Sequence, residues 1–219
     1  MAALALFDLD NTLIDRAAAF RRWATRFCSQ RALHDDAVER LIALDGDGYR
    51  RRADVFAEAR DLFGLAEPVE DLLAAYRRDY VLSYVKEDVV LGRLTQLRAA
   101  GWKIGIVTNG PATQTDKIAI TGLADLVDAC CVSEVVGAAK PDPVLFQTAA
   151  RLAGCELRGW MVGDNPEADI GGAHAVGLNT IWIARGRIWD RSDFAPTKTC
   201  ESILDAFDLL TEFQPVDDG

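Results

Sequence analysis

Residues 3–12 have the sequence ALALFDLDNT, and this stretch decides the fold. Its first half, Ala3–Phe7, is an unbroken apolar run of strand length, and its second half, Asp8–Thr12, begins with two acids separated by one residue. A short apolar run without polar alternation is typical of a parallel strand covered on both faces. Ligands bind at the carboxyl ends of such strands, so Asp8 and Asp10 are the first candidates for a functional site.

Further segments resemble the first strand in length and composition, and each is bounded by Gly, Asp or Asn. The clearest are Lys103–Val107, Trp160–Val162 and Thr180–Ile183, with a weaker one at Ala129–Val132. Helical patterns lie between most of them. One starts near Asp88, its expected cap, and stops at Gly101, and another stops at Gly154. Alternating strands and helices predict an α/β fold with a doubly wound, Rossmann-like parallel sheet.

The segment 16–85 interrupts this alternation, because it contains only helical patterns. We expect helices at about 16–32, 35–44, 51–63 and 68–84. One strand, a long helical excursion and then the rest of a sheet indicate an inserted domain. The predicted organisation is an α/β core of residues 1–15 and 86–219 with an all-α domain at 16–85.

The composition argues against several functions. The 219 residues carry a net charge of −10, and the densest basic stretch is only Arg50–Arg52, so a nucleic-acid partner is not expected. The five cysteines show no CxxC spacing, which disfavours a zinc site or a disulfide framework. We expect no membrane partner, because no apolar run approaches the ~20 residues of a membrane span. The first residues lack the basic leader of a signal peptide, so a cytoplasmic location is expected.

Polar residues follow several predicted strands in a shared pattern. Thr108–Pro111 and Asp164–Pro166 each end in a proline expected to be the first residue of a helix, and Lys140–Pro143 has the same helix start. Asn165 and Asp142 are the expected helix caps. A hydroxyl, a lysine and several carboxylates should therefore converge at one edge of the sheet, beside helix N-termini that suit phosphate.

These residue types are what phosphoryl transfer requires. Of two neighbouring carboxylates, one can attack phosphorus while the other donates and accepts protons. Asp8 and Asp10, together with Asp164, also offer the hard oxygen ligands that Mg²⁺ prefers.

With these motifs the chain resembles the haloacid dehalogenase superfamily, in its phosphatase branch with a helical, C1-type cap. The first motif is Asp8–Thr12, the second is Thr108, the third is Lys140 and the fourth is Asp164 followed by Asp169. The resemblance covers nearly the whole chain and is loosest across residues 16–85.

The resemblance implies a role for each motif residue. Asp8 is expected to be the nucleophile and Asp10 the general acid and base. Thr108 and the backbone N–H groups near Asn109 are expected to hold the phosphoryl oxygens, while Lys140 balances the negative charge. Mg²⁺ is expected between the Asp8 side chain, the Asp10 carbonyl and Asp164, with Asp169 completing or supporting its shell. The substrate is then a small phosphorylated metabolite, and the protein a monomer or homodimer.

Three other activities remain open. Dehalogenases of the superfamily carry Tyr where this chain has Asp10, which favours phosphate chemistry here. A phosphomutase or phosphotransferase would use the same aspartyl phosphate, and a non-catalytic binder of phosphorylated metabolites would use the same scaffold.

Within the inserted domain, residues 45–52 form either an exposed turn or a loop whose Tyr49 contacts substrate together with Arg50 or Arg51. Phe20, Trp23 and Phe27 repeat at helical spacing, and we interpret them as core residues rather than a stacking surface.

Overall fold

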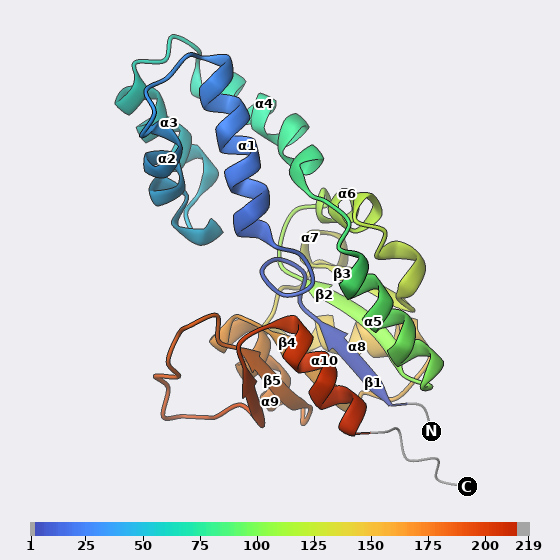
Figure 1. Ribbon diagram of the computed structural model, residues 1–219. Coiled ribbons are helices and arrows are strands. Elements are labelled where there is room, and N and C mark those ends of the chain that lie inside the picture. Colours follow the sequence, from blue (N-terminus) through green and yellow to red (C-terminus); the bar gives the residue numbers. More distant parts are fainter. Residues whose placement is uncertain (1–2, 214–219) are drawn as a thin grey trace, which may run out of the picture. The chain divides into compact units, whose positions relative to one another are not determined.

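The structure is a computed structural model that describes residues 3–213, and it contains two compact units (Figure 1). One unit is formed by Met1–Ile14 together with Lys86–Gly219, and the other by Asp15–Val85. The first contains a parallel sheet and the second is helical. The helical segment is therefore inserted between the first and second strands, as the break in the sequence pattern predicts.

The sheet of the first unit has six parallel strands in the order β3-β2-β1-β4-β5-β6. The strands are β1 (Leu4–Phe7), β2 (Lys103–Thr108), β3 (Ala129–Val132), β4 (Gly159–Gly163), β5 (Asn179–Ile183) and β6 (Lys198–Cys200). All four residues of β1 are buried, because the strand lies in the middle of the sheet and both faces are covered. The predicted α/β class and parallel sheet are confirmed.

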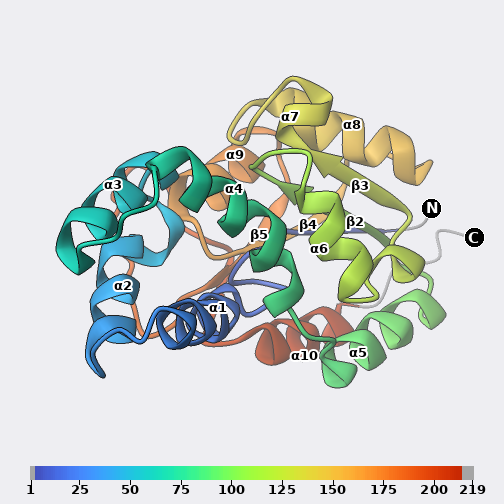
Figure 2. The same ribbon diagram turned by 90° about the horizontal axis from the view of Figure 1, so that it is seen from above.

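Helices cover both faces of this sheet. Figure 2 shows α5 and α10 together on one face and α8 and α9 on the other, in agreement with their packing. The helices of this unit are α5 (Asp88–Ala99), α6 (Gln114–Ile120), α7 (Ser133–Val136), α8 (Pro143–Ala153), α9 (Gly172–Ala175) and α10 (Ile203–Glu212). Two further segments are the 3₁₀ turn η3 (Ala124–Leu126) and the π-helical η4 (Pro166–Gly171). The helices cover the faces of the sheet but not the carboxyl ends of its strands, where polar residues follow.

Helix starts test the caps expected from the sequence. Asp142 caps α8 through the N–H of Val144, and Asn165 caps η4, with Pro166 as its first residue. Two expectations were wrong. Asp88 is the first residue of α5 rather than its cap. Pro111 lies three residues before Gln114, the first residue of α6. The Pro111 carbonyl accepts the Gln114 N–H in a turn that precedes the helix.

The second unit is built from four helices, α1 (Arg16–Gln30), α2 (Ala37–Asp45), α3 (Arg52–Phe63) and α4 (Val69–Tyr80), with 3₁₀ turns η1 (Gly46–Gly48) and η2 (Val81–Ser83). Each helix matches one of the segments expected from the sequence. Phe20, Trp23 and Phe27 are buried, and Trp23 packs edge-on against Tyr76 with ring centroids 4.9 Å apart. These aromatic residues are core residues, as interpreted from their spacing.

A buried ion pair fixes the turn between α2 and α3. Arg16, at the start of α1, donates two hydrogen bonds of 2.8 Å to the Asp45 carboxylate, and Arg52 pairs with the same carboxylate. Gly48 has φ +89°, and a Cβ at this position would lie 2.5 Å from the Arg16 guanidinium. Glycine is therefore required for the turn to pack against Arg16.

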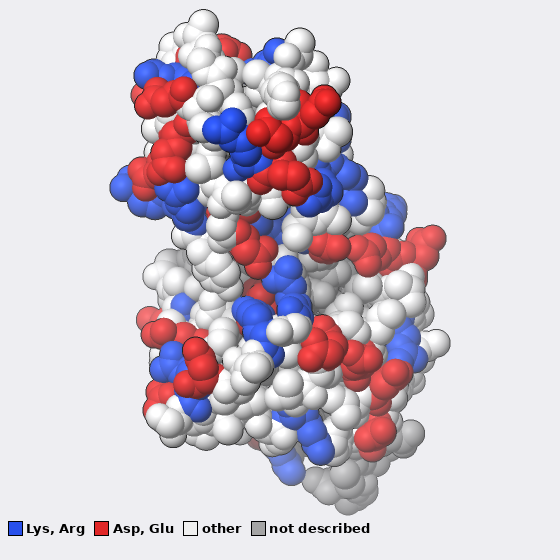
Figure 3. All heavy atoms as spheres, turned by 60° about the vertical axis from the view of Figure 1, so that its left-hand side comes forward, with Lys and Arg blue, Asp and Glu red and all other residues white. Residues whose placement is uncertain are grey.

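Charged side chains of both signs are interspersed on the face shown in Figure 3. The helical unit contains exposed ion pairs, such as Arg60 with Asp61 at 3.3 Å. Such pairs contribute little to stability because water and salt screen them. Among residues 3–213, no helix is both long and apolar enough to cross a bilayer.

Candidate active site

The polar residues of the candidate site come from three adjacent strands. Asp8 follows β1, Thr108 ends β2, and Asp164 follows β4. The order β2-β1-β4 places β1 between the other two, where the connections leave in opposite directions. This is the topological switch point at which α/β sheets bind their ligands.

Lys140 lies at the centre of the site, between two carboxylates. Its Nζ is 2.6 Å from Asp8 Oδ1 and 2.7 Å from Asp169 Oδ1, and it also donates to the Val107 carbonyl at 2.6 Å. Only 4% of Lys140 is exposed, so it is not the surface lysine that its proline-rich surroundings would also allow. Burial lowers its pKa, but Asp169 and Asp8 outweigh that effect and raise the pKa above the ordinary lysine value. Lys140 is therefore a fixed positive charge.

Three buried carboxylates surround one point. Oxygens of Asp8, Asp164 and Asp169 all lie within 4.8 Å of one another. Burial raises the pKa of Asp8 to about 7, opposed by Lys140 and assisted by the nearby Asp169. Burial likewise raises the pKa of Asp169 against the effect of Lys140. The three crowded, desolvated carboxylates, of which Asp8 and Asp169 have raised pKa values, form a hard-oxygen donor set. A divalent cation would stabilise this set, so these residues fit a Mg²⁺ ion.

The third carboxylate, Asp164, is held by residues from β5 and the loop that follows it. Arg187 and Arg185 approach Asp164 Oδ2 at 3.2 Å and 3.4 Å, and Trp182 Nε1 donates to the Asp164 carbonyl at 3.0 Å. The arginines were not predicted, because arginines in a loop carry no sequence signal that distinguishes them from solvent-exposed ones.

Asp169 has partners for both of its oxygens. Oδ1 pairs with Lys140, and Oδ2 accepts the Asn165 N–H at 2.9 Å. The side chain also packs against Gly163, where a Cβ would lie 2.3 Å from Asp169 Oδ2. Asp169 therefore orients Lys140 and the start of η4, in addition to facing the other carboxylates.

Thr108 and Asn109 lie on the other side of Asp8. Thr108 is only 1% exposed. The Asn109 side chain exchanges two 2.8 Å hydrogen bonds with the Lys140 backbone, donating from Nδ2 to the carbonyl and accepting the N–H at Oδ1. Asn109 thus ties the β2 end to the segment that carries Lys140, and its side chain is engaged in that role.

Asp10 is separate from the three-carboxylate group. Its carboxylate accepts hydrogen bonds from Lys117 at 2.7 Å and 2.9 Å and from Gln114 at 3.0 Å. Both partners were missed in the sequence. Their three-residue spacing on a helix just after Thr108 places them on one face, but a polar pair at this spacing is common on solvent-exposed helices.

Arg50 and Arg51 belong to the helical unit, in the turn before α3. Arg50 pairs with Glu58, with one contact of 3.2 Å, and donates to the Leu44 carbonyl at 3.1 Å. Arg51 is exposed. The structure therefore engages Arg50 in holding the end of α2 and presents Arg51 to solvent.

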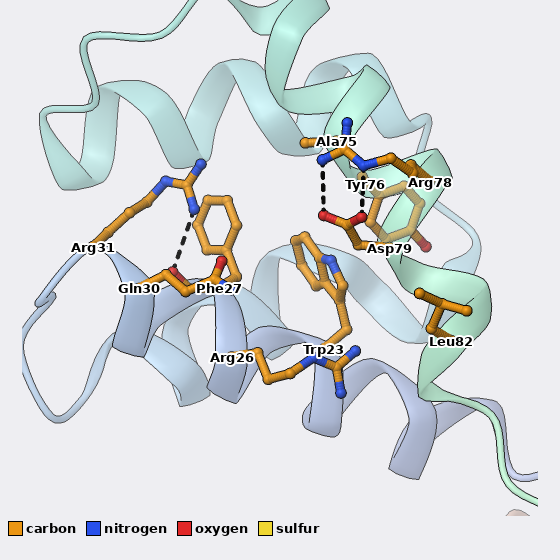
Figure 4. A pocket seen from close by; sticks show the side chains of 10 residues that line it. All are labelled: Trp23, Arg26, Phe27, Gln30, Arg31, Ala75, Tyr76, Arg78, Asp79 and Leu82. Carbon is orange, nitrogen blue, oxygen red and sulfur yellow. Dashed lines mark hydrogen bonds and ion pairs between the residues drawn. The ribbon is translucent and has the colours of Figure 1, made fainter.

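The helical unit contains a pocket of its own between α1 and α4, with a volume of about 340 Å³ (Figure 4). Trp23, Phe27 and Tyr76 line it together with arginines that are already paired, such as Arg78 with Asp79 at 2.8 Å. The buried aromatic residues thus have one edge on this pocket, although most of their surface is in the core.

Residues 2–177 match the family described as haloacid dehalogenase-like hydrolases. A glyceraldehyde 3-phosphate phosphatase of Methanopyrus kandleri is 31% identical over 207 residues, which are 87% of this chain and 87% of that protein. A ribulose-1,5-bisphosphate 5-phosphatase of Halopiger xanaduensis is 32% identical over an alignment of 239 positions, gaps included, which covers 97% of this chain and 98% of that protein.

A solved structure has the same fold. The magnesium-bound HAD-hydrolase YfnB of Bacillus subtilis has a TM-score of 0.78 and 23% identity, and the match covers 95% of this chain and 98% of that one. The family match spans most of the sequence. The parallel sheet and the helical insertion agree with the fold of the solved structure. Both curated relatives described above are phosphatases. The chain belongs to the haloacid dehalogenase-like hydrolases.

Proposed function

We propose that the chain hydrolyses phosphate monoesters of small metabolites, with Asp8 as a covalent nucleophile and Mg²⁺ as cofactor. One observation carries the proposal. Asp8 lies in a buried group of three carboxylates and contacts the Lys140 ammonium at 2.6 Å. A carboxylate beside a fixed cation and a metal-binding set is suited to attack an anionic phosphate, because the positive charges offset the repulsion.

In the first step an Asp8 oxygen attacks phosphorus. The bond from Asp8 to phosphorus forms as the bond to the leaving alcohol oxygen breaks, and that oxygen takes a proton from the Asp10 carboxyl group. Lys140 stays protonated and offsets charge on Asp8 and on the phosphoryl oxygens. The Thr108 hydroxyl and the backbone N–H groups near Asn109 are proposed to bind those oxygens.

In the second step Asp10, now a carboxylate, takes a proton from a water molecule. The resulting hydroxide attacks phosphorus, the bond to Asp8 breaks, and inorganic phosphate leaves. Asp10 is then protonated again and the cycle is closed. The second step must admit water to a site that excluded it in the first.

Asp8, Asp164 and the Asp10 carbonyl are proposed to hold the magnesium ion, and Asp169 to support it while orienting Lys140. When bound, the ion neutralises phosphate charge and lets an anionic nucleophile approach. Asp8 then remains ionised at neutral pH, because a nearby cation opposes the effect of burial on its pKa.

The relatives support a small substrate, since those named here act on glyceraldehyde 3-phosphate and ribulose 1,5-bisphosphate. We propose residues 16–85 as the cap domain that selects the substrate and residues 1–15 with 86–219 as the catalytic core. A phosphomutase would produce an isomer without net release of phosphate, and a non-catalytic binder would show thermal stabilisation by phosphorylated ligands without turnover.

The proposal is tested by phosphate release from p-nitrophenyl phosphate. We expect activity with Mg²⁺, a fall in the rate of at least about 100-fold in excess EDTA, and recovery when Mg²⁺ is restored. A fall of this order corresponds to the charge stabilisation that a metal ion supplies. Asp164→Asn should raise the Mg²⁺ concentration that gives half-maximal activity, because it removes one anionic ligand. Full activity in excess EDTA would contradict the proposal.

A second prediction concerns the turn before α3. For substrates with a second anionic group, Arg51→Ala is expected to raise KM about 10-fold, because one charged contact with the substrate is lost. Phosphate release from p-nitrophenyl phosphate should not change. Arg50→Ala serves as the matched control, because Arg50 already pairs with Glu58. Unchanged kcat/KM for ribulose 1,5-bisphosphate, which has a second phosphate, in both variants would remove Arg50 and Arg51 from substrate binding.

A further inference from the structure

The carboxylate of Asp10 is gripped by two side chains of α6. Lys117 Nζ contacts both oxygens, Oδ1 at 2.9 Å and Oδ2 at 2.7 Å, and Gln114 Nε2 donates to Oδ2 at 3.0 Å. Lys117 is 9% exposed and Gln114 is 2% exposed. These contacts join residues more than 100 positions apart and fix the direction in which the carboxylate points.

Gln114 also connects Asp10 with Thr108. Its Nε2 donates to Thr108 Oγ1 at 2.8 Å, so both amide hydrogens are used, one on each side chain. Because the Thr108 oxygen accepts this hydrogen bond, its own hydrogen is left to point elsewhere. In the proposed reaction it points to a phosphoryl oxygen.

The loop after β2 is shaped for this arrangement. Gly110 has φ +157°, and a Cβ there would lie 2.9 Å from Gln114 Cγ and 3.2 Å from Nε2. A side chain at position 110 would displace Gln114 from both of its partners. Glycine at position 110 therefore leaves the space that the Gln114 side chain occupies.

We infer that Lys117 and Gln114 are positioning residues that orient the Asp10 carboxyl group, and through Gln114 the Thr108 hydroxyl, for phosphoryl transfer. This inference rests on the proposed function, since it gives Asp10 its role as acid and base. Neither α6 residue touches the reacting atoms in this scheme. Their effect reaches the reaction through the two side chains that they hold.

Stability alone is a poor reason for this arrangement. The Lys117 and Asp10 side chains are only 11% and 24% exposed. Removing a lysine ammonium from water costs on the order of several kcal/mol, and an ion pair shielded from water often gains little over apolar residues of similar size. In contrast, a general acid must lie within hydrogen-bond reach of the leaving oxygen, and a misplacement of about 1 Å costs on the order of 100-fold in rate.

The inference predicts an effect that depends on the leaving group. A nitrophenolate ion leaves without a proton, whereas a simple alkoxide requires one from Asp10. The ratio kcat/KM reports only the steps up to transfer of the phosphoryl group to Asp8. Disorientation of Asp10 should therefore lower kcat/KM for an alkyl phosphate far more than for p-nitrophenyl phosphate.

The experiment compares wild type and Lys117→Met with these two esters in saturating Mg²⁺. We expect kcat/KM to fall about 100-fold for the alkyl ester, within the range that general acid catalysis supplies, and less than about 5-fold for the aryl ester. The variant should also release a burst of nitrophenol equal to the enzyme concentration, because the second step still needs Asp10 as base. Equal losses for both esters would overturn the inference.

Lys103→Met is the matched control. Lys103 pairs with Asp128 at 3.1 Å at the opposite end of β2, so this change removes a lysine–aspartate pair away from the site. It should leave the ratio of the two kcat/KM values unchanged. If Lys117→Met does not fold, Lys117→Gln keeps an uncharged N–H donor group and should show the same selective loss to a smaller degree. An unchanged ratio in that variant also overturns the inference. Absence of phosphate release by the wild type would instead contradict the proposed function itself.

Discussion

Asp8→Asn is expected to lower phosphate release by about 10⁴-fold or more, as for loss of a covalent nucleophile, and to make the metal-free protein more stable at neutral pH. The first effect follows because an amide cannot form the aspartyl phosphate. The second follows from the position of Asp8, which is 7% exposed and close to Asp169. A loss of activity with a gain in stability distinguishes a functional carboxylate from one retained for packing.

The sign of the stability effect follows from the pKa of Asp8. Burial raises it from 3.8 to about 7, so the folded protein binds this proton more tightly than the unfolded chain. Stability therefore falls as the pH rises from about 4 to about 7, where the charged carboxylate must be kept in a desolvated site. Asparagine has no charge to desolvate, and Lys140 still has Asp169 as a partner.

The measurement is thermal unfolding in EDTA at pH 7.5, with and without added Mg²⁺. We expect Asp8→Asn to unfold about 4 °C above wild type, which corresponds to roughly 1–2 kcal/mol for a chain of this size. Mg²⁺ should stabilise wild type more than the variant. Residual turnover near the wild-type level, or a melting temperature well below wild type, would contradict the assignment of Asp8.

Asp128→Asn is a control with the opposite expectation. Burial raises the pKa of Asp128, but the Ile104 N–H and Lys103 outweigh that effect and leave the pKa below its ordinary value. The Asp128 carboxylate therefore stabilises the folded state above about pH 4. Its removal should lower the melting temperature and leave turnover intact.

The fold could be predicted from the apolar strands and from the residues that mark helix starts and ends. Ala3–Phe7 and Lys103–Val107 have no polar alternation because both faces of the sheet are covered, and this makes central strands easy to recognise. β6 was missed for the opposite reason. It is an edge strand of three residues, Lys198–Cys200, that is mostly exposed, so it has no apolar pattern.

The residues of the site differ in the same way. Asp8, Thr108 and Asp164 follow buried strands, and the winding of the sheet brings strand ends together, so their convergence could be predicted. Lys117 could not be predicted, because its contact with Asp10 depends on the length of the turn after Thr108. That turn was predicted incorrectly at Pro111, where a helix start was expected three residues too early.

Lys140→Met is expected to destabilise the protein by about 3–5 kcal/mol at pH 8, the typical cost of removing one partner of a buried ion pair. It is also expected to lower kcat/KM by about 1000-fold, because the transition state loses a stabilising positive charge. Lys140 is the cation between Asp8 and Asp169, within 2.6 Å and 2.7 Å of their oxygens. Methionine fills a similar volume but leaves both buried carboxylates without this charge.

The stability of Lys140→Met should depend steeply on pH. Lys140 lowers the pKa of both Asp8 and Asp169, so without it both pKa values rise above those in the wild type, where Asp8 has a pKa of about 7. For acids whose pKa is raised by folding, the stability present at low pH is lost as the pH rises through the folded-state pKa. The free energy of unfolding of the variant should therefore be close to that of the wild type near pH 5 and should fall well below it by pH 8. Each unit of pKa shift corresponds to roughly 1.4 kcal/mol of this difference.

Thermal unfolding from pH 5 to pH 8.5, with and without Mg²⁺, checks this result. Mg²⁺ should restore part of the lost stability at pH 8, since it replaces positive charge beside the same carboxylates, but it should not restore turnover, because Lys140 also offsets charge on the transferring phosphoryl group. A melting temperature equal to wild type across this pH range would mean that the Asp8 and Asp169 carboxylates do not depend on Lys140. The electrostatic basis of the proposed site would then be wrong.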